Sequence, residues 1–131
     1  MNRSRFVTST LASIVTALLL SVAPGALAQM DQLKNTTPEQ RAKLQTDLMK
    51  SKLALTPEQT ATIGAMNEKY AQRMEPIIKG SEGPFTKMRQ MKQVSEAKEA
   101  ELKTILSPDQ FQKYLAEKEE MREQFEEKLL H

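Results

Sequence analysis

Residues 55–59 read LTPEQ and residues 106–110 read LSPDQ, and a looser copy, TTPEQ, occupies residues 36–40. In each copy a Thr or Ser precedes a Pro and stands three residues ahead of a Gln. A hydroxyl at the N-cap accepts from the backbone N–H three residues on, and Pro suits the first helical position, where no N–H is needed. The Gln reaches back to the N-cap N–H and completes a capping box. The phrase therefore predicts three helix starts, with these motif and cap residues: Thr37, Gln40, Leu55, Thr56, Gln59, Leu106, Ser107 and Gln110.

The stretches that follow these starts have the three-to-four-residue apolar spacing of amphipathic helices. We expect helices at about 38–53, from 57 onward, at 84–105 and at 108–129. Pro76 is expected to kink or end the second helix, because it lacks the N–H that the helix needs. The break KGSEGP at 79–84 places Gly80 as a C-terminal cap and starts the third helix at Pro84. No window alternates with a period of two, so the fold class is all-α, an elongated and bent hairpin of four helices.

The first residues are a predicted secretory signal peptide. Two Arg residues precede the apolar run at 11–23, and the small residues of PGALA follow it. The alternative is a transmembrane anchor, for which the run is short and interrupted by polar residues. We expect cleavage after Ala28, which removes residues 1–28. The mature chain, 29–131, is then expected to be a single domain without a membrane span. The export signal predicts a periplasmic protein.

The mature chain has a small apolar inventory and an uneven charge distribution. It contains no Cys, and only 18 of its 103 residues are Leu, Ile, Val or Phe. A thin core of this kind favours a homodimer. Residues 29–92 hold 11 basic and 7 acidic side chains, whereas 93–131 hold 6 and 10. Opposite charges on the two halves suggest antiparallel pairing within or between chains; the alternative is two solvated helix surfaces.

The residue inventory favours a binding protein over an enzyme. The chain has one His, at its last position, and no Cys nucleophile. His131 with Glu126 and Glu127 is a weak candidate for metal binding, and a frayed terminal histidine is the simpler interpretation. The short basic stretch at 87–92 lacks interleaved aromatic residues, so we expect no nucleic-acid partner. We therefore expect no enzymatic activity, no cofactor and no metal.

The two Leu-Thr/Ser-x-x-Gln motifs, at 55–59 and 106–110, resemble those of the Spy/CpxP family of bacterial periplasmic proteins. The resemblance covers roughly residues 37–129. It implies an antiparallel, cradle-shaped homodimer whose concave face mixes basic and apolar residues, with the motifs in a structural role. It also implies ATP-independent holding of unfolded or misfolded envelope proteins under stress, or inhibition of an envelope-stress sensor kinase. Family members bind or sense metals through histidines that this chain lacks, and the 51-residue motif spacing is short for Spy itself.

Methionine is flexible and polarisable, so it serves both irregular cores and adaptable binding surfaces. Ordinary core filling is one interpretation of the Met residues here. The other is that they stay open to clients, with cations beside them for acidic segments. The third predicted helix is expected to carry Phe85, Met88 and Met91 on its apolar face. The expected client-binding residues are Met66, Tyr70, Met74, Met88, Arg89, Met91 and Lys92. The alternatives are an accessory regulator that binds the periplasmic domain of a sensor kinase, or a metal-responsive periplasmic protein.

Overall fold

The computed structural model describes residues 31–131, and this part of the chain is all-helical with no strand. A short helical turn at 31–34 leads into four long helices. Their bounds are α2 Pro38–Leu53, α3 Pro57–Lys79, α4 Pro84–Ile105 and α5 Pro108–Leu130. The all-α prediction is confirmed, and each long helix begins at the proline that the sequence indicated. The predicted signal peptide, residues 1–28, lies outside the described residues.

Three of the four helices begin with a complete capping box. The hydroxyls of Thr37, Thr56 and Ser107 each accept from the backbone N–H of the Gln three residues on, at 3.1, 3.1 and 3.2 Å. Each Gln oxygen accepts the N-cap N–H in return, at 2.9 to 3.1 Å. The fourth helix start, at Gly83, has no side-chain cap. Satisfying the otherwise free N–H groups of the first turn is what fixes these boundaries.

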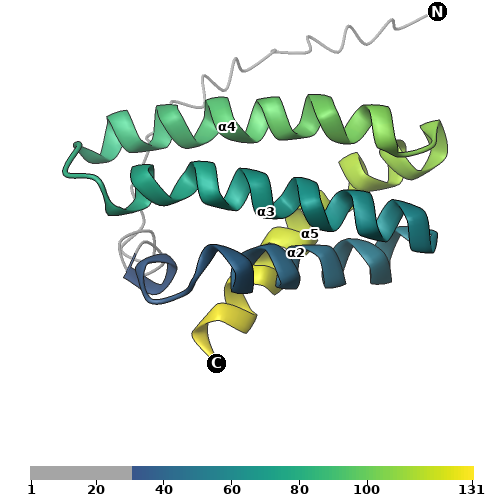
Figure 1. The fold of residues 1–131 in the computed structure, drawn as a ribbon, viewed down its shortest axis with the longest axis horizontal. Coiled ribbons are helices and arrows are strands. Elements are labelled where there is room, and N and C mark those ends of the chain that lie inside the picture. Colours follow the sequence, from purple (N-terminus) through teal and green to yellow (C-terminus); the bar gives the residue numbers. More distant parts are fainter. Residues whose placement is uncertain (1–30) are drawn as a thin grey trace, which may run out of the picture.

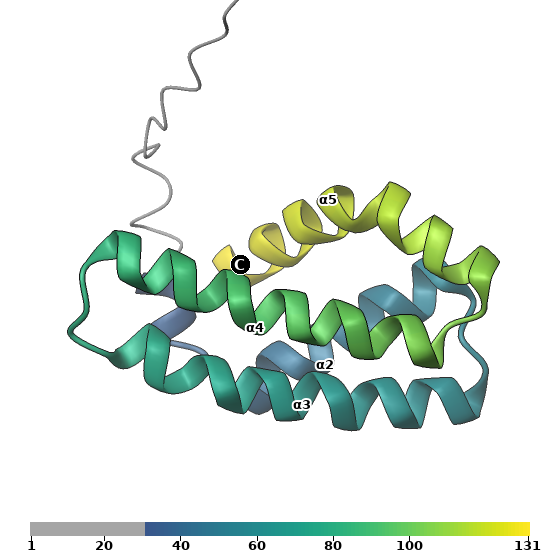
Figure 2. The same cartoon turned by 90° about the horizontal axis from the view of Figure 1, so that it is seen from above.

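The helices form an open, layered arrangement rather than a closed bundle. Figure 1 shows α3 running between α2 and α4, antiparallel to both. Helix α5 turns back from the end of α4 (Figure 2) and packs mainly against α2, and Figure 1 shows it diverging from α4 along its length. Helix α4 thus packs mainly on α3 and has little contact with α5. Among residues 31–131 no helix is both long and apolar enough to cross a bilayer.

One small core joins the four helices. Its fully buried members include Ile63 of α3 and Leu102 of α4, both 0% exposed. The rest of the cluster is Met49, Leu53, Leu55, Met66, Tyr70, Val94, Leu106 and Met121. Leu55 and Leu106, the first residues of the two motifs, are both buried in this core, so each motif anchors its own helix junction.

The structure refines two expectations about the helices. Of the two outcomes expected at Pro76, a kink or an end of the helix, the end does not occur, because α3 continues to Lys79. A proline removes a hydrogen bond to the turn before it and does not hinder the residues after it, so the last three residues of α3 stay helical. Phe85 and Met88, expected on the apolar face of the third helix, are 75% and 54% exposed, and the exposure of Met88 agrees with its expected client-binding role. The reason for this exposure is that α4 packs mainly on α3, so the other side of its first turns has no neighbouring helix.

The opposite charges of the two halves pair within the chain. The Lys52 ammonium of α2 lies 2.6 Å from Oε1 of Glu120 in α5. The Lys69 ammonium of α3 lies 2.6 Å from Oε2 of Glu101 in α4. Of the two interpretations, intramolecular pairing therefore applies to these side chains, each of which connects the basic half to the acidic half.

Candidate functional site

The two motif glutamines bind each other. The Gln59 side-chain amide donates to Oε1 of Gln110 at 2.7 Å, and the Gln110 amide donates to Oε1 of Gln59 at 2.9 Å. Each amide also donates to a backbone oxygen at the end of the helix that precedes the other Gln. Gln59 donates to Ile105 at the end of α4 at 3.4 Å, and Gln110 donates to Leu53 at the end of α2 at 3.3 Å. We call this pair the glutamine clasp. It ties the α2–α3 junction to the α4–α5 junction.

Every hydrogen-bonding position of the two clasp amides is used. A Gln amide has two N–H donors and an oxygen with two lone pairs. Each oxygen accepts one bond from its own N-cap and one from the other Gln, and each nitrogen donates twice. The sequence predicted the capping role of these residues. It did not reveal the clasp, because the third copy of the phrase makes the same cap at Gln40 without such a partner.

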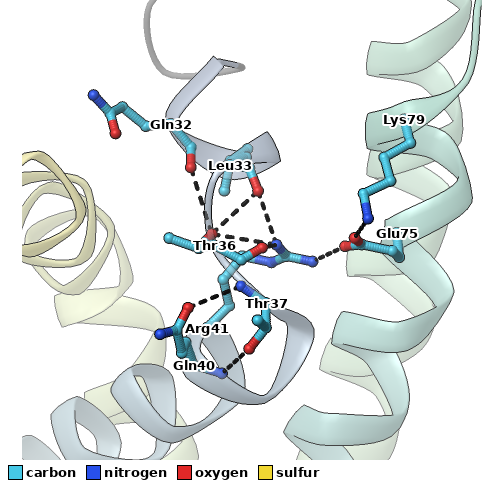
Figure 3. Close-up of polar contacts among 8 residues, drawn as sticks. All are labelled: Gln32, Leu33, Thr36, Thr37, Gln40, Arg41, Glu75 and Lys79. Atoms are coloured by element: carbon cyan, nitrogen blue, oxygen red, sulfur yellow. Dashed lines mark hydrogen bonds and ion pairs between the residues drawn. The ribbon is translucent and has the colours of Figure 1, made fainter.

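A second polar node holds the start of the described chain against α3. Figure 3 shows Arg41 reaching from α2 to the carbonyl oxygens of Leu33 and Thr36, at 2.9 and 2.6 Å. On its other side the guanidinium pairs with Glu75, which also accepts from Lys79. Arg41 is only 3% exposed. The sequence analysis missed it, although Arg41 stands seven residues ahead of Leu48 on the buried face of α2.

The predicted client-binding residues fall into three groups. Met66 and Tyr70 are buried in the core, 3% and 6% exposed, so their side chains are not on the surface of this structure. Tyr70 donates to Glu101 at 2.8 Å, an interaction that raises the pKa of the Tyr70 hydroxyl and joins α3 to α4. Met74 and Met91 are half-buried and line a hollow between the helices. The exposed group is Met88, Arg89 and Lys92.

The exposed residues of the first turns of α4 form one continuous face. Phe85, Met88, Arg89 and Lys92 are spaced by three and four residues, which places them on the same side of a helix, and all four are exposed. We call this face the α4 tip. It combines two large apolar side chains with two cations. The sequence analysis placed Phe85 on the apolar face of this helix but did not name it as a binding residue.

Lys87, on the opposite side of α4, anchors the tip. Its side chain is largely buried, and its ammonium donates to the backbone oxygen of Ile78 near the end of α3, at 3.1 Å. A cation there also interacts favourably with the negative end of the α3 dipole. The tip is therefore attached to a fixed hairpin.

Two adjoining hollows lie beside the core on the side facing α5. The larger, about 320 Å³, is lined by α2, α4 and α5, and the smaller, about 190 Å³, is also lined by α3. Gln45, Ser95, Lys98 and Phe125 line both. We call the two together the Lys98 groove. Lys98 was not a predicted site residue, although it stands four residues after buried Val94 and four before buried Leu102.

The metal alternative involved the C-terminal residues. Nowhere in residues 31–131 do three His, Asp or Glu side chains gather closely enough to hold a metal ion. His131 is exposed, and Glu126 pairs with Arg122 at 2.9 Å.

With this geometry described, comparison with known proteins gives one family. A model described as a domain of unknown function, DUF4890, matches residues 28–114. The chain belongs to the DUF4890 family. No curated protein and no solved structure matches it. The DUF4890 match includes both glutamines of the clasp and the whole α4 tip, and it ends within α5, so the clasp and the tip belong to the part that defines the family.

Proposed function

We propose that this chain is a periplasmic, ATP-independent chaperone-like protein of the Spy/CpxP type, which holds unfolded or misfolded envelope proteins on the α4 tip. The observation that carries the proposal is the exposure of Phe85 and Met88, 75% and 54%, on one face with Arg89 and Lys92. Exposed large apolar side chains grouped with cations are typical of surfaces that bind other proteins. The sequence resemblance to Spy/CpxP supplies the class of partner.

The chemistry of the tip suits segments of unfolded chains. Phe85 and Met88 offer adaptable apolar contacts, since Met has three rotatable bonds and a polarisable sulfur. Arg89 and Lys92 attract acidic segments and speed their encounter, an effect that salt weakens. Contacts of this kind are individually weak, so a client is released without an energy source. Met74 and Met91, in the adjoining hollow, are the proposed second contact layer.

The experiment is suppression of aggregation by residues 29–131 with two unrelated unfolded clients, in the absence of ATP. The variant F85S/M88S removes the apolar part of the tip without touching the core. We expect it to require about tenfold more protein for equal suppression, because losing two apolar anchors removes on the order of 1–2 kcal/mol of binding. The matched control A61S/A65S changes two exposed apolar positions of α3 and should act like the parent.

The charge contribution is tested separately. R89Q/K92Q should weaken suppression most for acidic clients at low salt, whereas K103Q/K113Q, at exposed cations elsewhere, should not. If the folded protein suppresses aggregation of neither client, general chaperoning is wrong. A dedicated partner, such as the periplasmic domain of a sensor kinase, then becomes the better proposal.

We also propose that the protein is a homodimer, as the thin core and the resemblance suggest. Sedimentation equilibrium of residues 29–131 tests this. The same measurement on F85S/M88S separates two uses of the α4 tip. If that variant is a monomer while the parent is a dimer, the tip is the subunit interface and the client-binding proposal is wrong.

A further inference from the structure

The lining of the Lys98 groove combines apolar side chains with polar Gln45 and Ser95 and with six charged residues, which are Arg41, Lys98, Glu99, Lys118, Glu119 and Arg122. In the larger hollow, Leu48, Met49, Leu102, Met121 and Phe125 provide apolar lining. In the smaller, the lining continues with Leu33, Met74, Ile78, Met91 and Val94. Ligand pockets have volumes of about 300–1,000 Å³ and are mostly apolar with a few polar groups that orient the ligand. The larger hollow reaches that range alone, and the smaller adjoins it, since four residues line both.

Lys98 is the one cation lining the groove that has no carboxylate partner within the described residues. Arg41 pairs with Glu75. The other two lining cations also pair, Lys118 with Glu99 at 3.2 Å and Arg122 with Glu119 at 3.1 Å. Both carboxylates that line the groove are therefore already neutralised by other side chains.

The Lys98 ammonium has unused hydrogen-bonding capacity. It donates to Oε1 of Gln45, and an ammonium has three N–H donors. Lys98 keeps some exposure as a residue, but burial of its ammonium lowers the pKa to about 8. This value is still above neutrality, so the charged form predominates at pH 7. A buried charge is unfavourable unless it is paired, and Glu99 and Glu119, the two carboxylates that line the groove, pair with Lys118 and Arg122 instead of Lys98.

From these observations we propose that the Lys98 groove binds a single-chain amphiphile with an anionic head, such as a fatty acid. The head pairs with the Lys98 ammonium and the acyl chain lies along the Met- and Leu-lined hollows. The volumes of the two hollows, about 320 and 190 Å³, suit one acyl chain better than the two chains of a diacyl lipid. This inference does not rest on client binding at the α4 tip, because none of the four tip residues lines the groove.

The test is calorimetric titration of residues 29–131 with dodecanoate at pH 7, below its micelle concentration. Dodecanol, which has the same chain without the charge, and dodecyltrimethylammonium, which has the opposite charge, are the matched ligands. We expect one dodecanoate per chain, bound at least tenfold more tightly than either. Equal binding of dodecanoate and dodecanol, or no binding of dodecanoate, overturns the proposal.

Variants locate the binding. K98M should weaken the binding of dodecanoate at least tenfold without affecting the binding of dodecanol. K98R, which keeps the positive charge, should bind dodecanoate like the parent. S95W, at an exposed position that lines both hollows, should block the chain while leaving the ammonium in place. K50M, at an exposed lysine of α2 outside the groove, is the control and should bind dodecanoate like the parent. A K98M variant that is folded by circular dichroism and binds dodecanoate unchanged also overturns the proposal.

The nature of the head is resolved by a second anionic ligand. Lauroyl lysophosphatidate carries a phosphate on the same chain length. Tighter binding of dodecanoate identifies a carboxylate site, tighter binding of the lysophosphatidate identifies a phosphate site, and equal affinities show that the site selects for negative charge alone. Each of these outcomes supports an anionic amphiphile, provided that the K98M effect is present.

Discussion

The side-chain amides of Gln59 and Gln110 are 51 residues apart in the chain and donate to each other at 2.7 and 2.9 Å. Each also closes a capping box at the start of its own helix. Glutamine therefore has two roles here. It helps to cap the starts of α3 and α5, and it joins the α2–α3 junction to the α4–α5 junction. Because the clasp uses both donors and both lone pairs of each amide, it requires Gln and not merely a capping residue.

Replacing Gln by Glu separates these two roles. Glu retains the acceptor that a capping box needs but has no N–H donors. In Q59E, carboxylate oxygens face the Gln110 oxygen and the Ile105 carbonyl, so we expect a loss of about 2 kcal/mol in the free energy of unfolding, measured in urea at pH 7. In the control Q40E, which has only a cap to preserve, stability should change by less than about 0.5 kcal/mol. Equal losses in the two variants would contradict the clasp.

Thr56→Ala tests the cap alone. The Thr56 hydroxyl accepts from the Gln59 N–H at 3.1 Å and is exposed, so its removal leaves one first-turn donor to water. We expect a loss of about 1 kcal/mol in unfolding free energy. Thr56→Ser keeps the hydroxyl and serves as the control. Unchanged thermal unfolding of Thr56→Ala would count against the capping assignment.

Ala54 has a conformation that suits glycine. It ends α2 with φ 51° and ψ 52°, the only described non-Gly residue with positive φ. A Cβ in the left-handed region is unfavourable by roughly 1–2 kcal/mol, so Ala54→Gly should stabilise the protein by about 1 kcal/mol after the added chain entropy of glycine is subtracted. Ala65→Gly, inside α3, should instead destabilise by about 1 kcal/mol. In chemical denaturation the free energy of unfolding should therefore rise in Ala54→Gly and fall in Ala65→Gly.

Gly80 is needed for space rather than for its backbone angles. Its φ is −65°, which any residue adopts, but an added Cβ would lie 2.8 Å from the Pro76 carbonyl oxygen. Gly80→Ala should therefore cost about 1–2 kcal/mol of stability. Gly83 has the same φ and open space around it, so Gly83→Ala meets no clash and should cost only about 0.5 kcal/mol, for the less favourable N-cap. Thermal unfolding should show a larger drop in midpoint temperature for Gly80→Ala than for Gly83→Ala.

The Arg41–Glu75 pair makes stability depend on acid pH. Hydrogen bonds from Lys79 and then Arg41 lower the pKa of Glu75 below 4.5. A carboxyl with a lowered folded-state pKa contributes stability above its unfolded-state pKa, and this contribution is lost as the pH falls through the folded-state value. Between about pH 5 and pH 3 the parent should therefore lose stability more steeply than Glu75→Gln.

The control for this pH dependence is Glu82→Gln. Glu82 is exposed in the α3–α4 turn and has no ion pair within the described residues. Its pH profile should match that of the parent. A Glu75→Gln profile as steep as the parent's would show that other carboxylates account for the acid sensitivity.

The sequence determined the helix boundaries, because their causes are local. A cap hydroxyl, the proline after it and the Gln that returns to it lie within four residues, so no distant partner is needed to place the starts at Pro38, Pro57 and Pro108. The apolar spacing that specifies an all-α chain is equally local. The local pattern at Pro76 allowed either a kink or an end of the helix, and the structure excludes the end. The pattern placed Phe85 on an apolar face, and only the packing of α4 shows that this part of the face has no neighbouring helix.

The tertiary structure decided the rest. Gln40 and Gln59 stand in nearly identical phrases, yet only Gln59 has a distant amide opposite it, and only the packing of the helix junctions provides one. In the same way, Arg41 and Lys98 both share a buried helix face with apolar residues. Packing places Glu75 beside Arg41, whereas within residues 31–131 it places no free carboxylate beside Lys98. Contacts between residues far apart in the chain depend on how helices are packed, and the local pattern does not encode that choice.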